Sequence, residues 1–145
     1  MLIGALASSL QHQGRLADAQ PLYLESLEAR RRSLGSDHPD TLAAINSYAF
    51  LLVDRGRLDE AEPLLREAVA TRRRVGGAHP STMLAIYNLA IVLERRGRLD
   101  EAHLLYREAY AGNQAALGEG HADTQACGTA LDRVLRAKYE QRRRK

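Results

Sequence analysis

The sequence predicts an all-α protein built from three antiparallel helix pairs and one further helix at the C-terminal end. Its composition is the first reason, because the chain of 145 residues contains no Trp, only 5% aromatic residues and many Leu and Ala. Such a composition favours helices over strands. The second reason is a short element, Gly-Arg-Leu, which begins at Gly14 and returns at Gly56 and Gly97. Its period of about 42 residues indicates a repeat protein.

A second repeated element has the same period and places the remaining turns. Gly-x-x-His occurs at Gly35, Gly76 and Gly118, in each case between two stretches with helical spacing. Turns are therefore expected near all six glycines of the two elements. We expect one domain over residues 1–145, with repeats at about 1–35, 36–76 and 77–118, a final helix at about 122–141 and a basic tail at 142–145.

Each repeat is predicted to contain two helices, as its middle copy illustrates. The apolar residues of the first helix follow helical spacing and are Leu42, Ile45, Tyr48, Ala49 and Leu52. Gly56 ends this helix because glycine adopts the left-handed conformation without steric cost. The second helix is expected to run from Leu58 to Arg74. It has acidic residues in its first turn and arginines in its last, the order that the helix dipole favours.

Small residues recur where the two helices of a pair must touch. They are Ala7, Ala49 and Ala90 in the first helices, and Ala19, Ala61 and Ala102 in the second helices. Larger apolar residues flank each of them. A small residue between large ones allows two helices to approach closely, so we expect these alanines to be buried.

This pattern of large, small and alanine positions resembles the tetratricopeptide repeat. The longer period and the Gly-x-x-His-Pro turn are similar to those of the kinesin light chain and nephrocystin-3 class. The resemblance extends from residue 1 to about residue 137. It implies a right-handed α-α superhelix in which the first helix of each repeat lines the concave surface. This repeat serves many unrelated pathways, so the resemblance does not identify a partner.

The last predicted helix departs from the first helices of the three repeats. Asp132 takes the place of Ala7, Ala49 and Ala90, and Gly128 takes the place of an isoleucine. A carboxylate at a close helix contact would be buried without a partner. We therefore expect a capping helix with its outer face in water, as solenoids require.

The net charge of +3 is unevenly distributed along the chain. Residues 136–145 carry +5 and the rest of the chain carries −2. This distribution disfavours nucleic-acid binding, because the body is not basic and aromatic residues are not interleaved with the basic ones. No apolar run is long enough to span a membrane, and the N-terminal residues lack the features of a secretion signal. A cytoplasmic location is expected.

The sequence contains no recognisable catalytic or metal-binding motif, so we expect neither enzymatic activity nor a cofactor. His38, His79 and His121 recur in register, but one histidine per repeat cannot converge on a single ion. They are predicted to be turn residues in front of the first helices. Cys127 has no second cysteine, and no base is predicted beside it.

A stripe along the predicted first helices is the candidate binding surface. On a helical wheel of about 100° per residue it lies beside the core-facing side. The stripe combines apolar and aromatic side chains with a basic end. Its members are Asn46, Phe50 and Asp54 in the middle repeat, Leu84, Tyr87, Ile91 and Arg95 in the third, and Arg133 and Arg136 in the last helix.

The leading hypothesis is a non-enzymatic scaffold that binds a peptide segment of a protein partner in this groove. The peptide would be apolar with some acidic character. An alternative is an architectural spacer, or a segment of a larger signalling or transport protein, with no ligand of its own. Phe50 and Tyr87 fit packing between neighbouring first helices equally well, so the sequence leaves both open. A nucleic-acid-binding arm at residues 142–145 is the third and weakest alternative.

Overall fold

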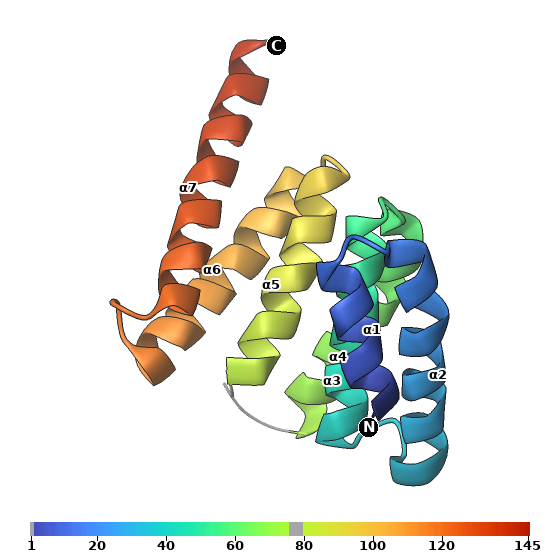
Figure 1. Cartoon of the computed structure of the whole chain (residues 1–145). Helices are drawn as coiled ribbons and strands as arrows, with labels where there is room; N and C mark the ends of the chain where they lie inside the picture. The colour runs from blue at the N-terminus through green and yellow to red at the C-terminus, as the bar shows by residue number, and fades with distance from the viewer. Residues whose placement is uncertain (1, 76–79) are drawn as a thin grey trace. The chain divides into compact units, whose positions relative to one another are not determined.

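Seven α-helices make up almost all of the chain that the computed structural model describes, which comprises residues 2–75 and 80–145 (Figure 1). In chain order they are α1 (Leu2–His12), α2 (Leu16–Leu34), α3 (Pro39–Asp54), α4 (Leu58–Val75), α5 (Pro80–Arg95), α6 (Leu99–Leu117) and α7 (Ala122–Arg143). No strand occurs among the described residues. The predicted all-α fold, with three helix pairs followed by one helix, is confirmed.

The contacts between helices group the chain into two units. Unit 1 is Met1–Val75 and contains α1 to α4, whereas unit 2 is Gly76–Lys145 and contains α5 to α7. Within each unit every helix packs against the next one along the chain. The first helices of the pairs are α1, α3 and α5, the second helices are α2, α4 and α6, and α7 has the register of a first helix. The assignment of residues 1–145 to one domain stays a prediction.

A tight turn reverses the chain within each helix pair. The φ angle of its glycine is 77° at Gly14, 74° at Gly56 and 81° at Gly97, which glycine adopts without steric cost. The residue after the glycine donates its backbone N–H to the preceding helix, for example Arg57 to the Leu52 carbonyl oxygen at 2.8 Å. This hydrogen bond closes the helix end in the Schellman manner. The structure confirms the predicted turns at Gly14, Gly35, Gly56, Gly97 and Gly118.

A histidine caps the helix that follows each of the described Gly-x-x-His turns. His38 Nδ1 accepts the backbone N–H of Asp40 at 3.0 Å, and His121 Nδ1 accepts that of Asp123 at 3.1 Å. These N-cap hydrogen bonds satisfy one of the free N–H groups at a helix start. The predicted role of these two histidines in the turns is confirmed. The predictions for Gly76 and His79 lie outside the described residues.

The small residues predicted at helix contacts are fully buried. An exposed fraction of 0% is found for Ala7, Ala49 and Ala90 in the first helices and for Ala19, Ala61 and Ala102 in the second helices. Neighbouring large side chains, such as Ile45, Leu65 and Ile86, are buried to the same extent. The core of each unit therefore lies between its first and second helices.

The last helix, α7, has the features predicted for a capping helix. Asp132 is exposed, although it takes the position of the buried alanines. A Cβ atom at Gly128 would lie 3.2 Å from the ring of Tyr110, so this glycine makes room for an aromatic side chain of α6. Because α7 continues to Arg143, the first two residues of the predicted basic tail belong to the helix.

Candidate functional site

The predicted binding residues fall into two sets, one in each unit. Unit 1 holds Asn46, Phe50 and Asp54 on α3, and unit 2 holds Leu84, Tyr87, Ile91 and Arg95 on α5 with Arg133 and Arg136 on α7. Two of these residues are apolar and yet largely exposed, with exposed fractions of 44% for Phe50 and 49% for Leu84. The half-buried members are Asn46, Tyr87 and Ile91, and the exposed polar members are Asp54, Arg95, Arg133 and Arg136.

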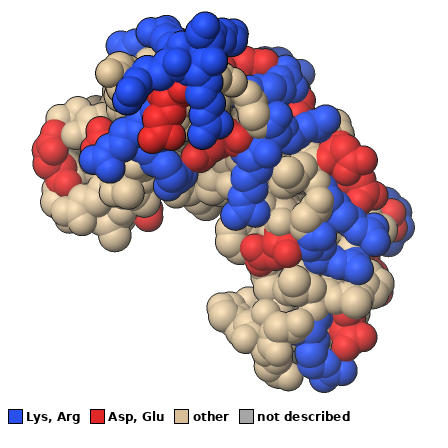
Figure 2. Space-filling model, turned by 90° about the horizontal axis from the view of Figure 1, so that it is seen from above, with Lys and Arg blue, Asp and Glu red and all other residues tan. Residues whose placement is uncertain are grey.

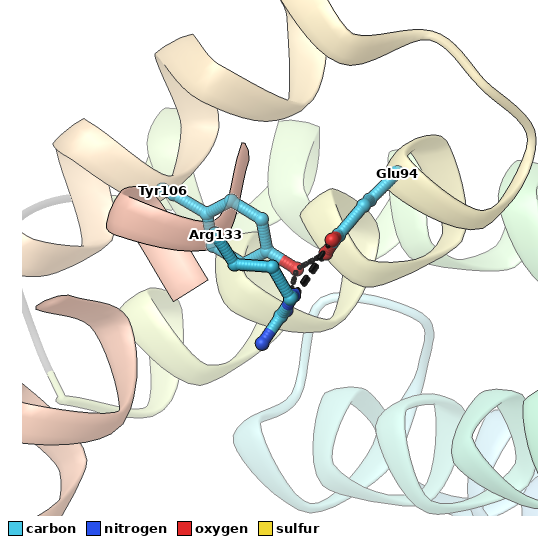
Figure 3. Close-up of polar contacts among 3 residues, drawn as sticks. All are labelled: Glu94, Tyr106 and Arg133. Carbon is cyan, nitrogen blue, oxygen red and sulfur yellow. Dashed lines mark hydrogen bonds and ion pairs between the residues drawn. The ribbon is translucent and has the colours of Figure 1, made fainter. Parts of the chain in front are cut away.

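In unit 2 a polar contact of three residues links α5, α6 and α7 (Figure 3). The Tyr106 hydroxyl on α6 donates to the Glu94 carboxylate on α5 at 2.8 Å. Arg133 on α7 donates twice to the same carboxylate, at 2.7 Å from Nε and 2.8 Å from Nη2. Arg133 thus forms an ion pair with a residue of its own unit, although 53% of its side chain is exposed.

This contact shifts the pKa of each of its members. The hydrogen bonds from Arg133 lower the pKa of the Glu94 carboxyl, more than burial raises it. Burial and the hydrogen bond to Glu94 raise the pKa of Tyr106, and the hydrogen bonds to Glu94 raise the pKa of Arg133. Near neutral pH the contact is therefore an ion pair with a neutral hydroxyl donor attached.

Unit 1 has a contact of the same layout without an ion pair. The Tyr23 hydroxyl on α2 donates to Gln11 Oε1 on α1 at 2.7 Å, and Gln11 Nε2 donates to the Asp54 carboxylate on α3 at 2.9 Å. In the repeat, Gln11 takes the position of Glu94 and Tyr23 that of Tyr106. Asp54 of the predicted surface therefore connects two first helices.

Gln11 and Glu94 were not predicted from the sequence, although the repeat contains a signal for them. At the equivalent positions of α3 and α4, Val53 and Leu65 are apolar and buried. The two positions thus differ together between repeats. The first and third repeats have a polar residue and a tyrosine there, and the middle repeat has two aliphatic residues. Comparison of these two positions across the three repeats identifies the contact.

A small apolar pocket adjoins the polar contact of unit 2. Its volume is about 60 Å³, and it is lined by Leu84 and Tyr87 of α5, Asn113 of α6, and Asp123, Ala126 and Cys127 of α7. The Tyr87 ring packs edge-on against the Tyr106 ring, with 5.6 Å between the ring centroids. This packing holds one wall of the pocket in place, while Leu84 stays exposed to solvent.

One lining residue of this pocket, Asn113, has a buried side-chain acceptor without a donor. Asn113 is 4% exposed, and its Nδ2 donates to Cys127 Sγ at 3.5 Å. Its Oδ1 accepts no hydrogen bond from the described residues. Leaving such an acceptor unpaired costs about 1–3 kcal/mol. Burial raises the pKa of the Cys127 thiol, which disfavours the reactive thiolate.

Charged side chains cover much of the remaining surface. Figure 2 shows Lys and Arg over much of the visible face, with Asp and Glu among them. Arg95 and Arg136 are exposed in unit 2, so they are the members of the predicted basic end that a partner can approach. No three His, Cys, Asp or Glu side chains of the described part are placed to hold a metal ion. None of the described helices has the length and apolar character needed to cross a membrane.

Comparison with known proteins identifies the repeat. The profile described as tetratricopeptide repeat matches residues 1–49 and 40–115. No curated protein sequence matches the chain significantly. Among solved structures, 31 chains match.

Three of the similar structures illustrate the range of likeness. A kinesin light chain-type protein of Podosopora anserina with nearly identical TPR-like repeats is 26% identical, with a TM-score of 0.88 over 94% of this chain and 65% of that one. A single-residue variant of it is 26% identical, with a TM-score of 0.86 over 91% and 63%. BtubC (BKLC) from P. vanneervenii is 19% identical, with a TM-score of 0.73 over 97% and 63%, which shows the fold alone. The chain spans less than two thirds of the length of each.

Proposed function

Because the chain belongs to the tetratricopeptide repeat family, we propose that it is a non-catalytic scaffold that captures a peptide segment of a partner protein on the exposed sides of its first helices. The fold is that of protein-interaction scaffolds. The proposed capture takes place in the cytoplasm, and the peptide is apolar with some acidic character.

The observation that supports this proposal most is the apolar pocket of unit 2. Leu84 and Tyr87 provide an apolar edge that a peptide side chain covers, and Asn113 adds a polar group to the same lining. A volume of about 60 Å³ suits a small aliphatic group. An apolar site with a few polar groups, here Asn113 and Asp123, is the usual composition of a ligand pocket.

The acidic character of the peptide is inferred from the arginines of unit 2. Arg95 and Arg136 are exposed, and they attract carboxylates during approach. Arg133 is less suited to this role because its guanidinium already holds the Glu94 carboxylate. Arg136→Glu is therefore the cleaner charge reversal, since Arg133→Glu would also place two carboxylates together.

Peptide display against the whole chain tests the proposal, followed by affinity measurements with Leu84→Ala. We expect the affinity of selected peptides to fall by about 1–2 kcal/mol, the loss typical of an apolar anchor. Leu104→Ala is the matched control, because Leu104 is also exposed, at 62%, but lies on the second helix α6. Arg136→Glu should slow association and reduce its salt dependence.

The other candidate roles predict different results in the same experiment. If Leu104→Ala weakens capture as much as Leu84→Ala, the first helices do not form the site. If display yields no peptide, the spacer role gains support. If only deletion of residues 142–145 abolishes capture, the basic tail is the site.

A further inference from the structure

Unit 1 contains a larger and more polar pocket at the repeat position of the apolar pocket in unit 2. It lies between α1, α2 and α3 and has a volume of about 250 Å³. The lining positions that the two pockets share are Gly4, Arg30, Ala43 and Ala44 in unit 1, and Tyr87, Asn113, Ala126 and Cys127 in unit 2. The fold therefore builds the same site twice with different side chains.

Gly4 is the residue that keeps the pocket of unit 1 open. Its counterpart in unit 2 is Tyr87, whose ring forms a wall of the smaller pocket. A Cβ atom at Gly4 would meet only the Oγ of Ser26, at 3.9 Å, which is ordinary van der Waals contact. The missing side chain therefore leaves space that a ligand group can enter.

The polar groups around this space are hydroxyls and a single cation. Ser8, Ser26 and Ser47 line it from α1, α2 and α3, and no Asp or Glu lines it. The half-buried Arg30 donates from Nη1 to the backbone oxygen of Asp40 at 3.3 Å, and it forms no ion pair with any described carboxylate. Its neighbour Arg31, in contrast, is paired with Glu67 at 2.9 Å. Most of the five N–H donors of the Arg30 guanidinium are thus available.

We propose that this pocket of unit 1 binds an anionic side chain of the partner peptide, a carboxylate or a phosphate held by Arg30 and the serine hydroxyls. A guanidinium binds either group through two parallel hydrogen bonds, and hydroxyls add further donors. The inference rests on the proposed function, because it assigns a subsite in unit 1 to a peptide of the partner protein. Unit 2 takes an apolar side chain, and unit 1 takes an acidic one.

An NMR titration of the whole chain tests the pocket without a selected peptide. The probes are N-acetylaspartic acid amide, N-acetylphosphoserine amide and the neutral N-acetylasparagine amide. We expect saturable shifts of the Ser8, Ser26, Ser47 and Arg30 signals with either anion and none with the neutral amide. The anion that binds more tightly shows whether the pocket prefers a carboxylate or a phosphate side chain. Equal shifts with the neutral amide would overturn the proposal.

Paired variants locate the effect in the pocket. Arg30→Asn introduces the residue that unit 2 has at the equivalent position. It should weaken anion binding about tenfold or more, because this is the usual effect of losing a hydrogen bond to a charged group. Arg32→Asn removes the same charge from an exposed position of the same helix and should change binding less than about twofold. Gly4→Tyr should fill the pocket and abolish binding, whereas Gly4→Ala should preserve most of it. Equal effects of Arg30→Asn and Arg32→Asn would show that only the general surface charge is sensed.

The titration and the peptide display fail independently. Anion binding that depends on Arg30 supports the pocket even where display yields no peptide. Selected peptides whose capture is unchanged by Arg30→Asn leave the proposed function standing and refute the anion subsite. A third outcome supports both the proposed function and the anion subsite. In it, the wild type captures a peptide only when the peptide's single acidic residue is present, whereas the Arg30→Asn variant captures the peptide equally well without that residue.

Discussion

Units 1 and 2 share a fold and a repeat register, but they place different chemistry at equivalent sites. Tyr23 in unit 1 donates to an uncharged amide, whereas Tyr106 in unit 2 donates to a carboxylate that also holds an arginine. The pocket of unit 1 is polar and open at Gly4, and that of unit 2 is apolar and narrowed by Tyr87. The buried alanines, in contrast, are the same in both.

The difference separates the residues that determine the fold from those available for function. Buried alanines and turn glycines are required by helix packing and chain reversal, so each repeat retains them. Positions beside the core contact can change as long as their partners change with them. A repeat protein can thus vary its binding chemistry from one unit to the next without altering its helices.

The largest effect is expected where the two units do not differ. Ala7→Leu and Ala90→Leu each insert a large side chain into a fully buried contact and should each cost about 1–3 kcal/mol in unfolding free energy. Urea denaturation of the two variants measures this. A cost at one site and none at the other would mean that the units are packed differently.

The tyrosine hydroxyls should distinguish the two units by about 1 kcal/mol, which is the expected difference between the costs of their removal. Tyr106→Phe removes a hydrogen bond to a charged group and should cost about 1.5–3 kcal/mol, whereas Tyr23→Phe removes a neutral one and should cost about 0.5–1.5 kcal/mol. Both variants keep the aromatic ring, so packing is unchanged. Equal losses in urea denaturation would contradict the distinction between a charged and a neutral contact.

The response to pH sharpens the same comparison, because Glu94 titrates and Gln11 does not. The pKa of Glu94 in the folded state lies below its ordinary value of 4.5. Its contribution is therefore complete above about pH 5 and is lost as the pH falls through the lower folded value. We expect the stability difference between wild type and Glu94→Gln to shrink from pH 6 to about pH 3. A difference that is constant across this range would show that the ion pair does not form in solution.

The smallest effect is expected at the outer face of the capping helix. Asp132→Ala alters an exposed side chain and should change the unfolding free energy by less than about 0.5 kcal/mol. Its equivalent position in α5 is Ala90, so the pair of variants compares one repeat position in two environments. A loss at Asp132→Ala as large as that at Ala90→Leu would mean that the last helix is covered on both sides.

Most of the fold could be predicted from the sequence because its determinants are periodic. Turn glycines, buried alanines and the exposed Asp132 each follow from a position in the repeat, and the described residues bear these predictions out. The capping role of His38 is a local effect of the same kind. The tetratricopeptide assignment is supported by the profile match over residues 1–49 and 40–115.

The candidate site could be predicted only in part, because its key residues lie where the repeats differ. The helical wheel predicts that Asp54 and Arg133 lie on the surface, but their partners are on other helices and depend on tertiary packing. Asn113 and Arg30 lie on second helices, outside the stripe of first-helix residues that predicts the binding surface. Neither could be found from the first-helix stripe alone.

Photo-crosslinking of a display-selected peptide tests most directly whether the first helices capture the partner. A photoreactive phenylalanine replaces the apolar anchor of the peptide, and the adducts are located by mass spectrometry. The account predicts adducts on α5 and α7 around Leu84 and Tyr87, and their loss when unlabelled peptide competes. Adducts confined to the second helices, for example around Leu104, would contradict it.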